Sequence, residues 1–437
     1  MYSQTTKHNT LISCPDCDLL LSGRVAPVSH TLLCPRCGKT IGKRTANSVL
    51  KTLVLSLTGL LMFFPAIILP LMTFESFGFS DSANILESIV NLFLNDYFMV
   101  AIMVAISAVL FPFALLTAIF IVSLQLHKKR YPPYLTTLFR LYIHLEEWAM
   151  IEVYLLGIMI TIIKMVDTTE IIYHSGIFCF SALVVVTLAI STVIDKRFFW
   201  QTIEHKDQTH SANKPGSPAE NNNTTAAEAG LILCHTCHKL SPISLEDKGC
   251  PRCGGKLHIR KANTLSRTWA LVITSMIFLL PANLLPIMEV DFLGIPERST
   301  ILDGIIYFFQ HDSYLIGLII FTASILVPVF KVTGLIILLL TSRPSAPRFL
   351  REKTQMYRFI AFIGRWSMLD IFVIALLTVL VDFGFLTSIH AAPAATYFCI
   401  VVAATMLAAI TFDPRVMWDK CGSKSKQHHK ISSFQKE

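Results

Sequence analysis

Charged side chains are scarce in this sequence, because Asp, Glu, Lys and Arg make up 15% of its 437 residues. Soluble domains average about 25%, and hydrophobic residues make up 53% of this chain. The composition therefore indicates a membrane protein and excludes the roughly three soluble domains that the length alone would suggest. The sequence also contains no P-loop, so we do not expect this chain to hydrolyse nucleotides itself.

Eight apolar stretches are long enough to cross a bilayer as helices, which takes about 20 residues each. They are predicted at 49–73, 98–126, 148–166, 176–194, 266–288, 314–341, 366–383 and 392–412. The first stretch follows a polar segment that contains cysteines, so we expect no cleavable signal peptide.

Lys and Arg are concentrated in alternate loops. The loop after the second stretch contains the run HKKR at 127–130, whereas residues 74–97 contain four acids and no Lys or Arg. Because cytoplasmic loops carry an excess of Lys and Arg, both termini are expected in the cytoplasm. The net charge of +8 is then a signal of topology and a means of holding anionic lipid headgroups, and no nucleic-acid partner is expected.

The two halves of the sequence repeat one another. The run FFPAIILPLM at 63–72 matches LLPANLLPIM at 279–288, a displacement of 216 residues, and later motifs match at 218, as Trp148 does with Trp366. Both copies start and end on the same side of the membrane. The predicted units are a first ribbon (1–47), a first four-helix module (48–200), a flexible linker (201–230), a second ribbon (231–262), a second four-helix module (263–418) and a basic cytoplasmic tail (419–437).

Eight of the eleven cysteines form four C-x-x-C pairs. They are Cys14, Cys17, Cys34 and Cys37 in the first ribbon, and Cys234, Cys237, Cys250 and Cys253 in the second. Two such pairs at ribbon spacing supply the four thiolates of a closed tetrahedral zinc site. The sequence therefore predicts two structural Zn²⁺ sites, with the ribbons acting as scaffolds or docking surfaces on the cytoplasmic face.

A second interpretation of these cysteines is redox chemistry, because a C-x-x-C pair in the cytoplasm can act as a dithiol. Duplication and the partner pairs favour zinc, and disulfides are disfavoured in the cytoplasm. His235 and His238 lie beside the ligands, but they are expected to be solvated loop residues.

Lys331 is the most unusual polar residue inside a predicted span. It lies 12 residues before Arg343, hence roughly 18 Å deep at 1.5 Å per residue, where an unpaired cation costs about 2.5 to 3.5 kcal/mol on insertion scales. Asp370 is the nearest intramembrane carboxylate of the same half. We expect the two to pair, either as a switch that couples movement to a proton gradient or as a static ion pair that fixes helix packing.

We expect this Lys/Asp pair only in the second half. In the first half the position of Lys331 is occupied by Leu115, while that of Asp370 is occupied by Glu152. Possible hydrogen-bonding neighbours of the pair are Thr333, Ser324 and Ser367.

Two pairs of prolines lie toward the far ends of the first and fifth spans. Pro65 with Pro70, and Pro281 with Pro286, are predicted either to kink these helices and shape a periplasmic opening or to mark helix ends. The loops that follow are apolar with few acids, and they are typical of short strands or of helices lying on the membrane.

Taken together, the CPDC and CPRCG ribbons, the PAIILPLM and PANLLPIM runs, the duplicated four-helix modules and the Asp-x-Arg-x-x-Trp exits resemble the paraquat-inducible protein A family. The resemblance extends over both halves and excludes the linker. It implies a multi-pass protein of the bacterial inner membrane with cytoplasmic zinc ribbons and tetraspanin-like modules. It also implies a periplasmic MCE-domain partner that forms a tunnel, into which this chain loads phospholipids or from which it receives them.

Two other functions are compatible with the sequence. One is a membrane scaffold whose ribbons recruit cytoplasmic proteins without transport, and the other is a membrane thiol oxidoreductase. Buried Lys331 and Asp370 favour transport over the scaffold, since a passive anchor does not require charges inside the membrane. We therefore expect a transport subunit and not an enzyme.

Overall fold

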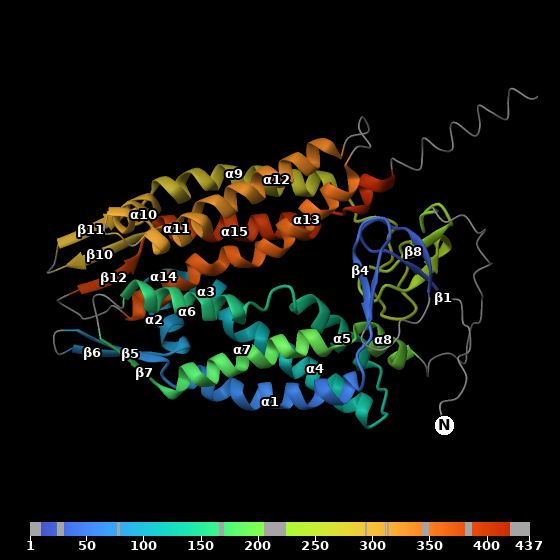
Figure 1. Cartoon of the computed structure of the whole chain (residues 1–437), viewed down its shortest axis with the longest axis horizontal. Helices are drawn as coiled ribbons and strands as arrows, with labels where there is room; N and C mark the ends of the chain where they lie inside the picture. Colours follow the sequence, from blue (N-terminus) through green and yellow to red (C-terminus); the bar gives the residue numbers. More distant parts are fainter. Residues whose placement is uncertain are drawn as a thin grey trace, which may run out of the picture.

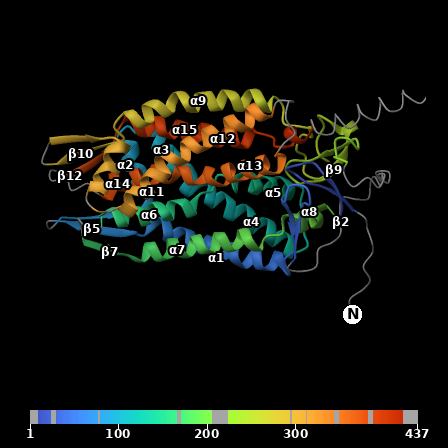
Figure 2. The same ribbon diagram turned by 45° about the horizontal axis from the view of Figure 1, so that its top comes forward.

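The computed structural model describes residues 10–23, 30–76, 79–165, 170–204, 224–292, 295–310, 312, 314–342, 349–380 and 387–419. Long helices run side by side, with the cysteine ribbons at one end and two small β-sheets at the other (Figure 1). The view turned by 45° shows the same division (Figure 2). We call these two ends the ribbon end and the sheet end.

The described part of the first module consists of eight helices and one π-helical turn, which lies between the third and the fourth helix. Its elements are α1 (Ser48–Ile68), α2 (Ile85–Leu94), α3 (Phe98–Val104), η1 (Ala105–Leu110), α4 (Phe111–His127), α5 (Tyr134–Leu145), α6 (Ile151–Met165), α7 (Ser175–Val193) and α8 (Lys196–Glu204). Helix α1 packs against α4 and α7. The segment from α3 through η1 to α4 is continuous, so it forms the second long helix of the module.

The second module repeats this order. Its elements are α9 (Thr264–Leu284), α10 (Ile301–Gln310), α11 (Tyr314–Phe321), η3 (Thr322–Leu326), α12 (Val327–Thr341), α13 (Leu350–Gly364), η4 (Arg365–Met368), α14 (Leu369–Leu380) and α15 (Pro393–Thr411). Helix α9 packs against α12 and α15. Both π-helical turns stand just before a proline, Pro112 or Pro328, so the irregularity is part of the repeat.

Seven of the described helices are long and apolar enough to cross a membrane, one fewer than the sequence predicts. The predicted span at 148–166 appears as α6, which has 15 residues and falls short of the usual length of about 20. The predicted span at 366–383 begins earlier, because α13, η4 and α14 run on as one helix. Eight spans are therefore not confirmed.

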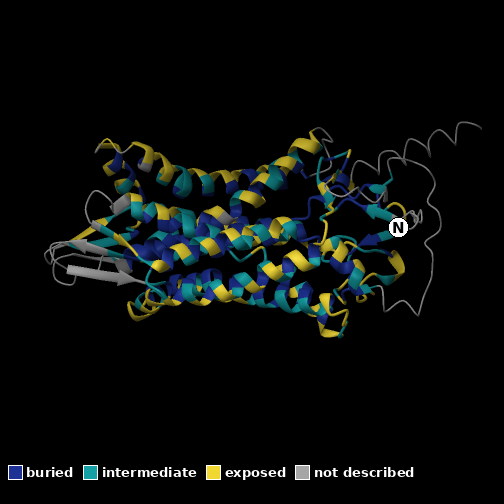
Figure 3. Ribbon diagram, turned by 60° about the horizontal axis from the view of Figure 1, so that its bottom comes forward, coloured by how far each residue is buried: buried dark blue, intermediate teal, exposed yellow. Residues whose placement is uncertain are grey.

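The short helix α6 lies at the junction of the two modules, against its counterpart α14. A Cβ atom on Gly157 would lie 3.1 Å from the Cβ atom of Phe372, and the rings of Tyr154 and Phe372 are 5.1 Å apart. Buried residues of both modules form one continuous apolar core here. Exposed and buried residues alternate along the outer helices (Figure 3).

A three-stranded antiparallel sheet closes each module at the sheet end. The first contains β5 (Met72–Ser76), β6 (Phe79–Ala83) and β7 (Glu170–Tyr173), and the second contains β10 (Met288–Phe292), β11 (Ile295–Ser299) and β12 (Thr387–Ala391). In each sheet the strand after the first helix is central; Met72 pairs with Ala83 and Tyr173, and Met288 pairs with Ser299 and Ala391. For the loops after the first and fifth spans, the sequence predicted either strands or helices lying on the membrane. Both loops contain two strands followed by a short helix, α2 or α10.

The proline pairs divide into two roles. Pro65 and Pro281 lie inside α1 and α9, where their carbonyl oxygens still accept hydrogen bonds of 3.1 Å from Leu69 and Leu285. Pro70 and Pro286 follow the ends of these helices, so they stand at helix termini and not at kinks. Kinks at Pro65 and Pro281 stay a prediction.

The ribbons are built from short hairpins. The first contains β1 (Thr10–Ser13), β2 (Leu20–Gly23), β3 (Thr31–Leu33) and β4 (Thr40–Lys43), and the second contains β8 (Leu231–Leu233), β9 (Leu240–Pro242) and η2 (Ile243–Leu245). The predicted linker is shorter than 201–230, because α8 extends to Glu204 and Thr225 forms a β-bridge with Leu19 of the first ribbon. Residues 205–223, residues 420–437 of the predicted tail and Cys421 lie outside the described residues.

Candidate metal centres and membrane polar centre

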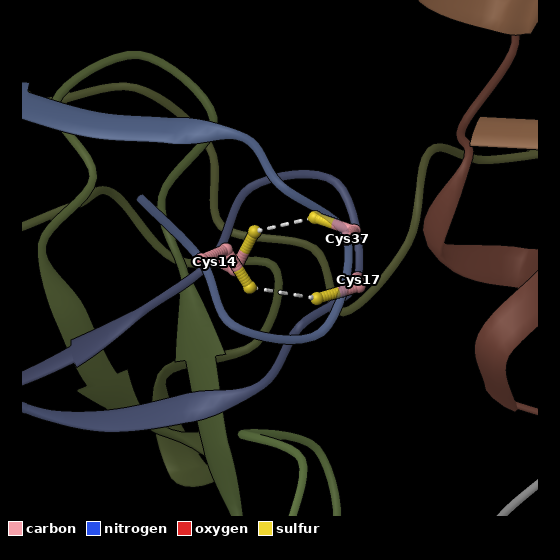
Figure 4. A group of neighbouring side chains, drawn as sticks. Cys14, Cys17 and Cys37 are labelled. Atoms are coloured by element: carbon pink, nitrogen blue, oxygen red, sulfur yellow. Dashed lines mark hydrogen bonds between the residues drawn. The ribbon is translucent and has the colours of Figure 1, made fainter. Parts of the chain in front are cut away.

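The eight predicted ligands form two buried clusters of four cysteines. In the first, Cys14 and Cys37 have sulfur atoms 3.5 Å apart, and those of Cys17 and Cys34 are 3.6 Å apart. Figure 4 shows the sulfurs of Cys14, Cys17 and Cys37 facing a common centre between the ribbon turns. In the second cluster the matching distances are 3.5 Å for Cys234–Cys253 and 3.6 Å for Cys237–Cys250.

All four C-x-x-C turns have the same backbone geometry, which aims both sulfurs of each pair to one side. The residue after the second cysteine has a positive φ in every turn, at Asp18, Gly38, His238 and Gly254. Its amide donates to the carbonyl of the first cysteine, as from Gly38 to Cys34 at 2.8 Å. Glycine adopts this conformation at no steric cost, which explains Gly38 and Gly254.

The clusters fit a four-coordinate metal ion. Four sulfurs each about 2.3 Å from a zinc ion at the centre of a tetrahedron lie about 3.8 Å from one another, close to the observed separations. His235 and His238 belong to neither cluster and are exposed. The ring of His235 is nevertheless bound by Arg415, so it is not the simply solvated loop residue that the sequence predicts. Two four-thiolate sites therefore suit ions that stabilise the ribbons, and they leave no open position for catalysis.

Each ribbon packs against the membrane module of the other repeat. The cysteines of the first ribbon share an apolar cluster with Leu335, Ile360 and Trp418 of the second module. Those of the second ribbon share one with Phe139 and Trp200 of the first module. This exchange has no signal in the sequence, because the repeat predicts equally well that each ribbon packs on its own module.

Two equivalent arginines make the crossed contacts specific. Arg358 on α13 donates to the carbonyl oxygen of Cys37 at 2.7 Å and to the carboxylate of Asp16 at 2.8 Å. Arg140 on α5, 218 residues earlier in the sequence, donates to the carbonyl oxygen of Cys253 at 3.3 Å. The guanidinium carbon of Arg36 also lies 4.4 Å above the ring of Trp418.

The second copy of the Asp-x-Arg-x-x-Trp motif, at residues 413–418, joins the second ribbon to the second module as well. Arg415 has 1% of its surface exposed, and its guanidinium group donates two hydrogen bonds to the carboxylate of Asp413, at 3.0 and 2.9 Å. It also donates to Nε2 of His235 at 2.7 Å. The motif is therefore a buried polar clamp, a role that its spacing did not predict.

Lys331 is fully buried within the second module. Its ammonium group donates to the hydroxyl oxygen of Thr405 at 2.8 Å and to that of Ser367 at 3.2 Å. These three residues, which we call the polar centre, come from α12, α15 and η4. The sequence predicted Ser367 but missed Thr405, because a threonine inside an apolar span carries no distinguishing pattern.

The other predicted neighbours lie differently. Ser324 is buried in η3, whereas Thr333 is exposed and donates to the carbonyl of Val329 in its own helix at 2.7 Å. Asp370 is half-buried at the start of α14. The described partners of Lys331 are hydroxyls, so its ion pair with Asp370 stays a prediction.

Comparison with known proteins identifies relatives along nearly the whole chain. The E. coli (strain K12) protein named intermembrane transport protein PqiA is 32% identical over 410 residues, covering 94% of this chain and 95% of that protein. The lipophilic envelope-spanning tunnel protein A of the same strain is 31% identical over 406 residues, covering 93% and 90%. A probable intermembrane transport protein of Haemophilus influenzae is 29% identical over 418 residues, covering 93% and 95%.

No solved structure gives a significant match to this chain. The family described as paraquat-inducible protein A matches twice, at residues 49–204 and 265–422. These two regions coincide with the two membrane modules, so the internal repeat is a repeat of the family's own unit. The chain therefore belongs to the paraquat-inducible protein A family.

Proposed function

We propose that this protein is an inner-membrane subunit of an intermembrane lipid transport system. It loads phospholipids into a tunnel formed by a periplasmic MCE-domain partner, or receives them from it. Two relatives that cover more than nine-tenths of the chain are named for intermembrane transport and for an envelope-spanning tunnel. The short sheet-end loops of this chain have too little mass to bridge an envelope, which supports the need for a partner.

The polar centre is the observation that carries this proposal. Lys331 lies in a helix bundle rich enough in apolar residues to cross a membrane, and its described partners, Ser367 and Thr405, carry no charge. Ionisable groups inside a membrane are costly and mark substrate or proton pathways. Leu115 occupies the matching place in the first module, so the shared scaffold folds without this cation.

Proton coupling is the finer part of the proposal. Asp370 stands three residues after Ser367, about one helical turn away. In the proposed cycle a shift of η4 or α12 brings its carboxylate to the ammonium group, and protonation of the carboxylate, or loss of the ammonium proton, releases it. In this account the Lys331–Asp370 pair forms in one step of the transport cycle and opens in another.

The proposed orientation places the ribbons and both termini in the cytoplasm. Basic residues gather at the ribbon end, in the loop after α4 and at the start of α13, and acids gather in the strands of the sheet end. The sheet end then faces the periplasm, where it meets the partner. The two cysteine clusters hold structural Zn²⁺, and the protein is not an enzyme.

Two alternatives keep specific support. A scaffold is favoured by the ribbons, whose two cysteine clusters lie together at one end of the molecule and suit closed metal sites. A thiol oxidoreductase would use the same cysteines, but all four sulfurs of each cluster lie within 4.8 Å of one another, as metal binding requires and a dithiol does not. Reversible dithiol titration in a protein without metal would favour the oxidoreductase.

The test is purification of the tagged full chain from its native membranes in mild detergent, with mass spectrometry of everything that is bound. We expect phospholipid together with a periplasmic MCE-domain protein. A preparation that contains neither, but contains cytoplasmic proteins held by the ribbons, would contradict transport and support the scaffold.

A further inference from the structure

Helices α2 and α10 occupy the same place in the two modules, between the sheet and the second long helix. Each has 10 residues, about half of what a membrane crossing takes. Figure 1 shows both near the sheet end of the bundle. Neither is a span, so something other than membrane crossing must account for their composition.

Both helices are apolar on two faces. The inner face packs on the protein through buried Ile85 and Leu92 in α2, and through Ile301 and Phe308 in α10. The outer face is exposed at three equivalent positions, and each side chain there has 41% to 53% of its surface exposed. These positions are Leu86 and Leu302, Val90 and Ile306, and Phe93 and Phe309.

The first turn of each helix is polar and capped. The side chain of Asn84 accepts a 2.7 Å hydrogen bond from the amide of Glu87, and Thr300 and Asp303 cap α10 reciprocally, at 2.9 and 3.2 Å. Hydrogen bonds from the Thr300 amide and hydroxyl lower the pKa of Asp303, which keeps this carboxylate charged. The acidic residues of the first turns, Glu87 in α2 and Asp303 in α10, therefore suit a polar environment, while the outer faces suit an apolar one.

The outer faces continue directly onto the long helices. Phe98 and Met99 of α3, and Tyr314 and Leu315 of α11, are exposed, and their helices are the ones that cross the membrane. The rings of Phe93 and Phe98 are 4.9 Å apart, and those of Phe309 and Tyr314 are 6.0 Å apart. The surface that meets acyl chains along α3 and α11 thus extends onto α2 and α10 without a break.

We infer that α2 and α10 lie in the membrane plane, each with its outer face buried among acyl chains of the leaflet at the sheet end. Helices of this kind sink about 5 to 10 Å into the boundary between headgroups and chains. A protein partner is not required, since continuity with the membrane-facing helices supplies the occupant in both repeats. The inference rests on the chain's membrane insertion and is independent of what it transports.

The two copies differ in what holds their inner faces. Both helices pack against the next helix of their own module, α2 against α3 and α10 against α11, but α2 also packs against α14 of the second module, whereas α10 also packs against β11 of its own. The ring of Phe309, which belongs to the outer face of α10, lies beside Gly317 of α11, where an added Cβ atom would be 3.0 Å from it. Lipid contact on the outer face is nevertheless the same for both, and this equality makes the two repeats controls for one another.

The test places a nitroxide label on Val90→Cys or Ile306→Cys, with the full chain in phosphatidylcholine vesicles. The background carries Cys179→Ser, Cys399→Ser and Cys421→Ser. Collision of the label with oxygen, which partitions into acyl chains, is compared with collision with a water-soluble nickel chelate. Leu57→Cys, exposed on α1, gives the reference for lipid, and Glu297→Cys, exposed on β11, gives the reference for water.

We expect oxygen to exceed the nickel chelate severalfold at both test positions, as at position 57, and the ratio to reverse at position 297. Nickel access at 90 and 306 equal to that at 297 would overturn the inference, as would exclusion of both reagents, which would indicate cover by protein. A lipid signal at one position alone would also overturn it. The experiment needs neither partner nor transport, so its failure is distinct from failure of the proposed function.

Discussion

Arg358 donates a 2.7 Å hydrogen bond to the carbonyl oxygen of Cys37, a residue 321 positions earlier in the chain. The equivalent Arg140 makes the equivalent contact to Cys253. Each ribbon is therefore joined covalently to one membrane module and held by the other. This exchange interlocks the two repeats at the ribbon end, while α6 and α14 join them within the bundle.

Replacing Arg358 by Ala should loosen the first ribbon. The change removes the bonds to Cys37 and Asp16, and bonds of this charged kind contribute about 1.5 to 3 kcal/mol each. Hydrogen exchange should rise over residues 10–23 and 30–43 and stay unchanged in α9 and α15. The matched variant Arg140→Ala should instead affect residues 231–257, and faster exchange of the ribbon attached to the same module would contradict the crossed arrangement.

Each chain should contain two zinc ions by elemental analysis. Cys37→Ser should lower this to one, since a structural site depends on all four thiolates, and Cys179→Ser should leave it at two. Chelation should make the ribbons sensitive to protease, because the binding energy of a structural metal is folding energy. A value well under two for the unmodified chain would contradict the metal assignment.

The metal sites and the repeat were predictable because their signals are local or periodic. Cysteine spacing alone identified all eight cysteines that form the two clusters, and the nearly constant displacement between repeated motifs identified both modules. Lys331 was conspicuous as a cation in an apolar span, and Ser367 was one of three hydroxyl residues expected as its possible neighbours. Orientation of the side chains was not predictable in this way, so Thr333 was expected beside Lys331 but faces outward.

Long-range packing was what the sequence did not reveal. The third strand of each sheet comes from a loop about one hundred residues further along the chain, and the ribbons exchange modules. A pattern in the sequence reports the environment of an element, but two similar modules offer each ribbon similar surfaces. The shortness of α6 was hidden for a related reason, since the apolar residues Trp148, Ala149 and Met150 precede its start without being part of the helix.

Glu204 should give the second ribbon a specific dependence on pH. Burial raises the pKa of Glu204, but hydrogen bonds and charges from Lys239 and Arg252 outweigh it, so the net pKa is lowered. A lowered pKa stabilises the fold above the unfolded value of about 4.3, and this contribution is lost as pH falls through the folded value. The difference in thermal stability between the unmodified chain and Glu204→Gln should be full at pH 7 and shrink below about pH 4.

Acid also releases zinc from thiolates, but it does so in both proteins, so their difference isolates Glu204. A difference that does not change between pH 7 and pH 3 would contradict a charged Glu204 at this contact. A difference that grows as pH falls would mean that the pKa is raised.

The hydroxyls of the polar centre should contribute measurably to stability. Thr405→Val and Ser367→Ala each remove one bond to Lys331, and bonds of this kind in membranes average about 0.6 kcal/mol. Unfolding of the protein in detergent measures the loss. In a Lys331→Met background the same substitutions should cost less, because the bond to position 331 is already absent. Thr333→Val should be neutral in both backgrounds, because its hydroxyl bonds within its own helix.

The central claim is that the second module moves lipid through its polar centre. The direct measurement is the rate at which labelled phospholipid passes between vesicles containing the full chain and the periplasmic partner purified with it. Lys331→Met should lower this rate at least about tenfold, equivalent to about 1.4 kcal/mol in the barrier, while Leu115→Met at the matching place in the first module should leave it unchanged. Transfer at the unmodified rate by a correctly inserted, zinc-loaded Lys331→Met protein would contradict the account.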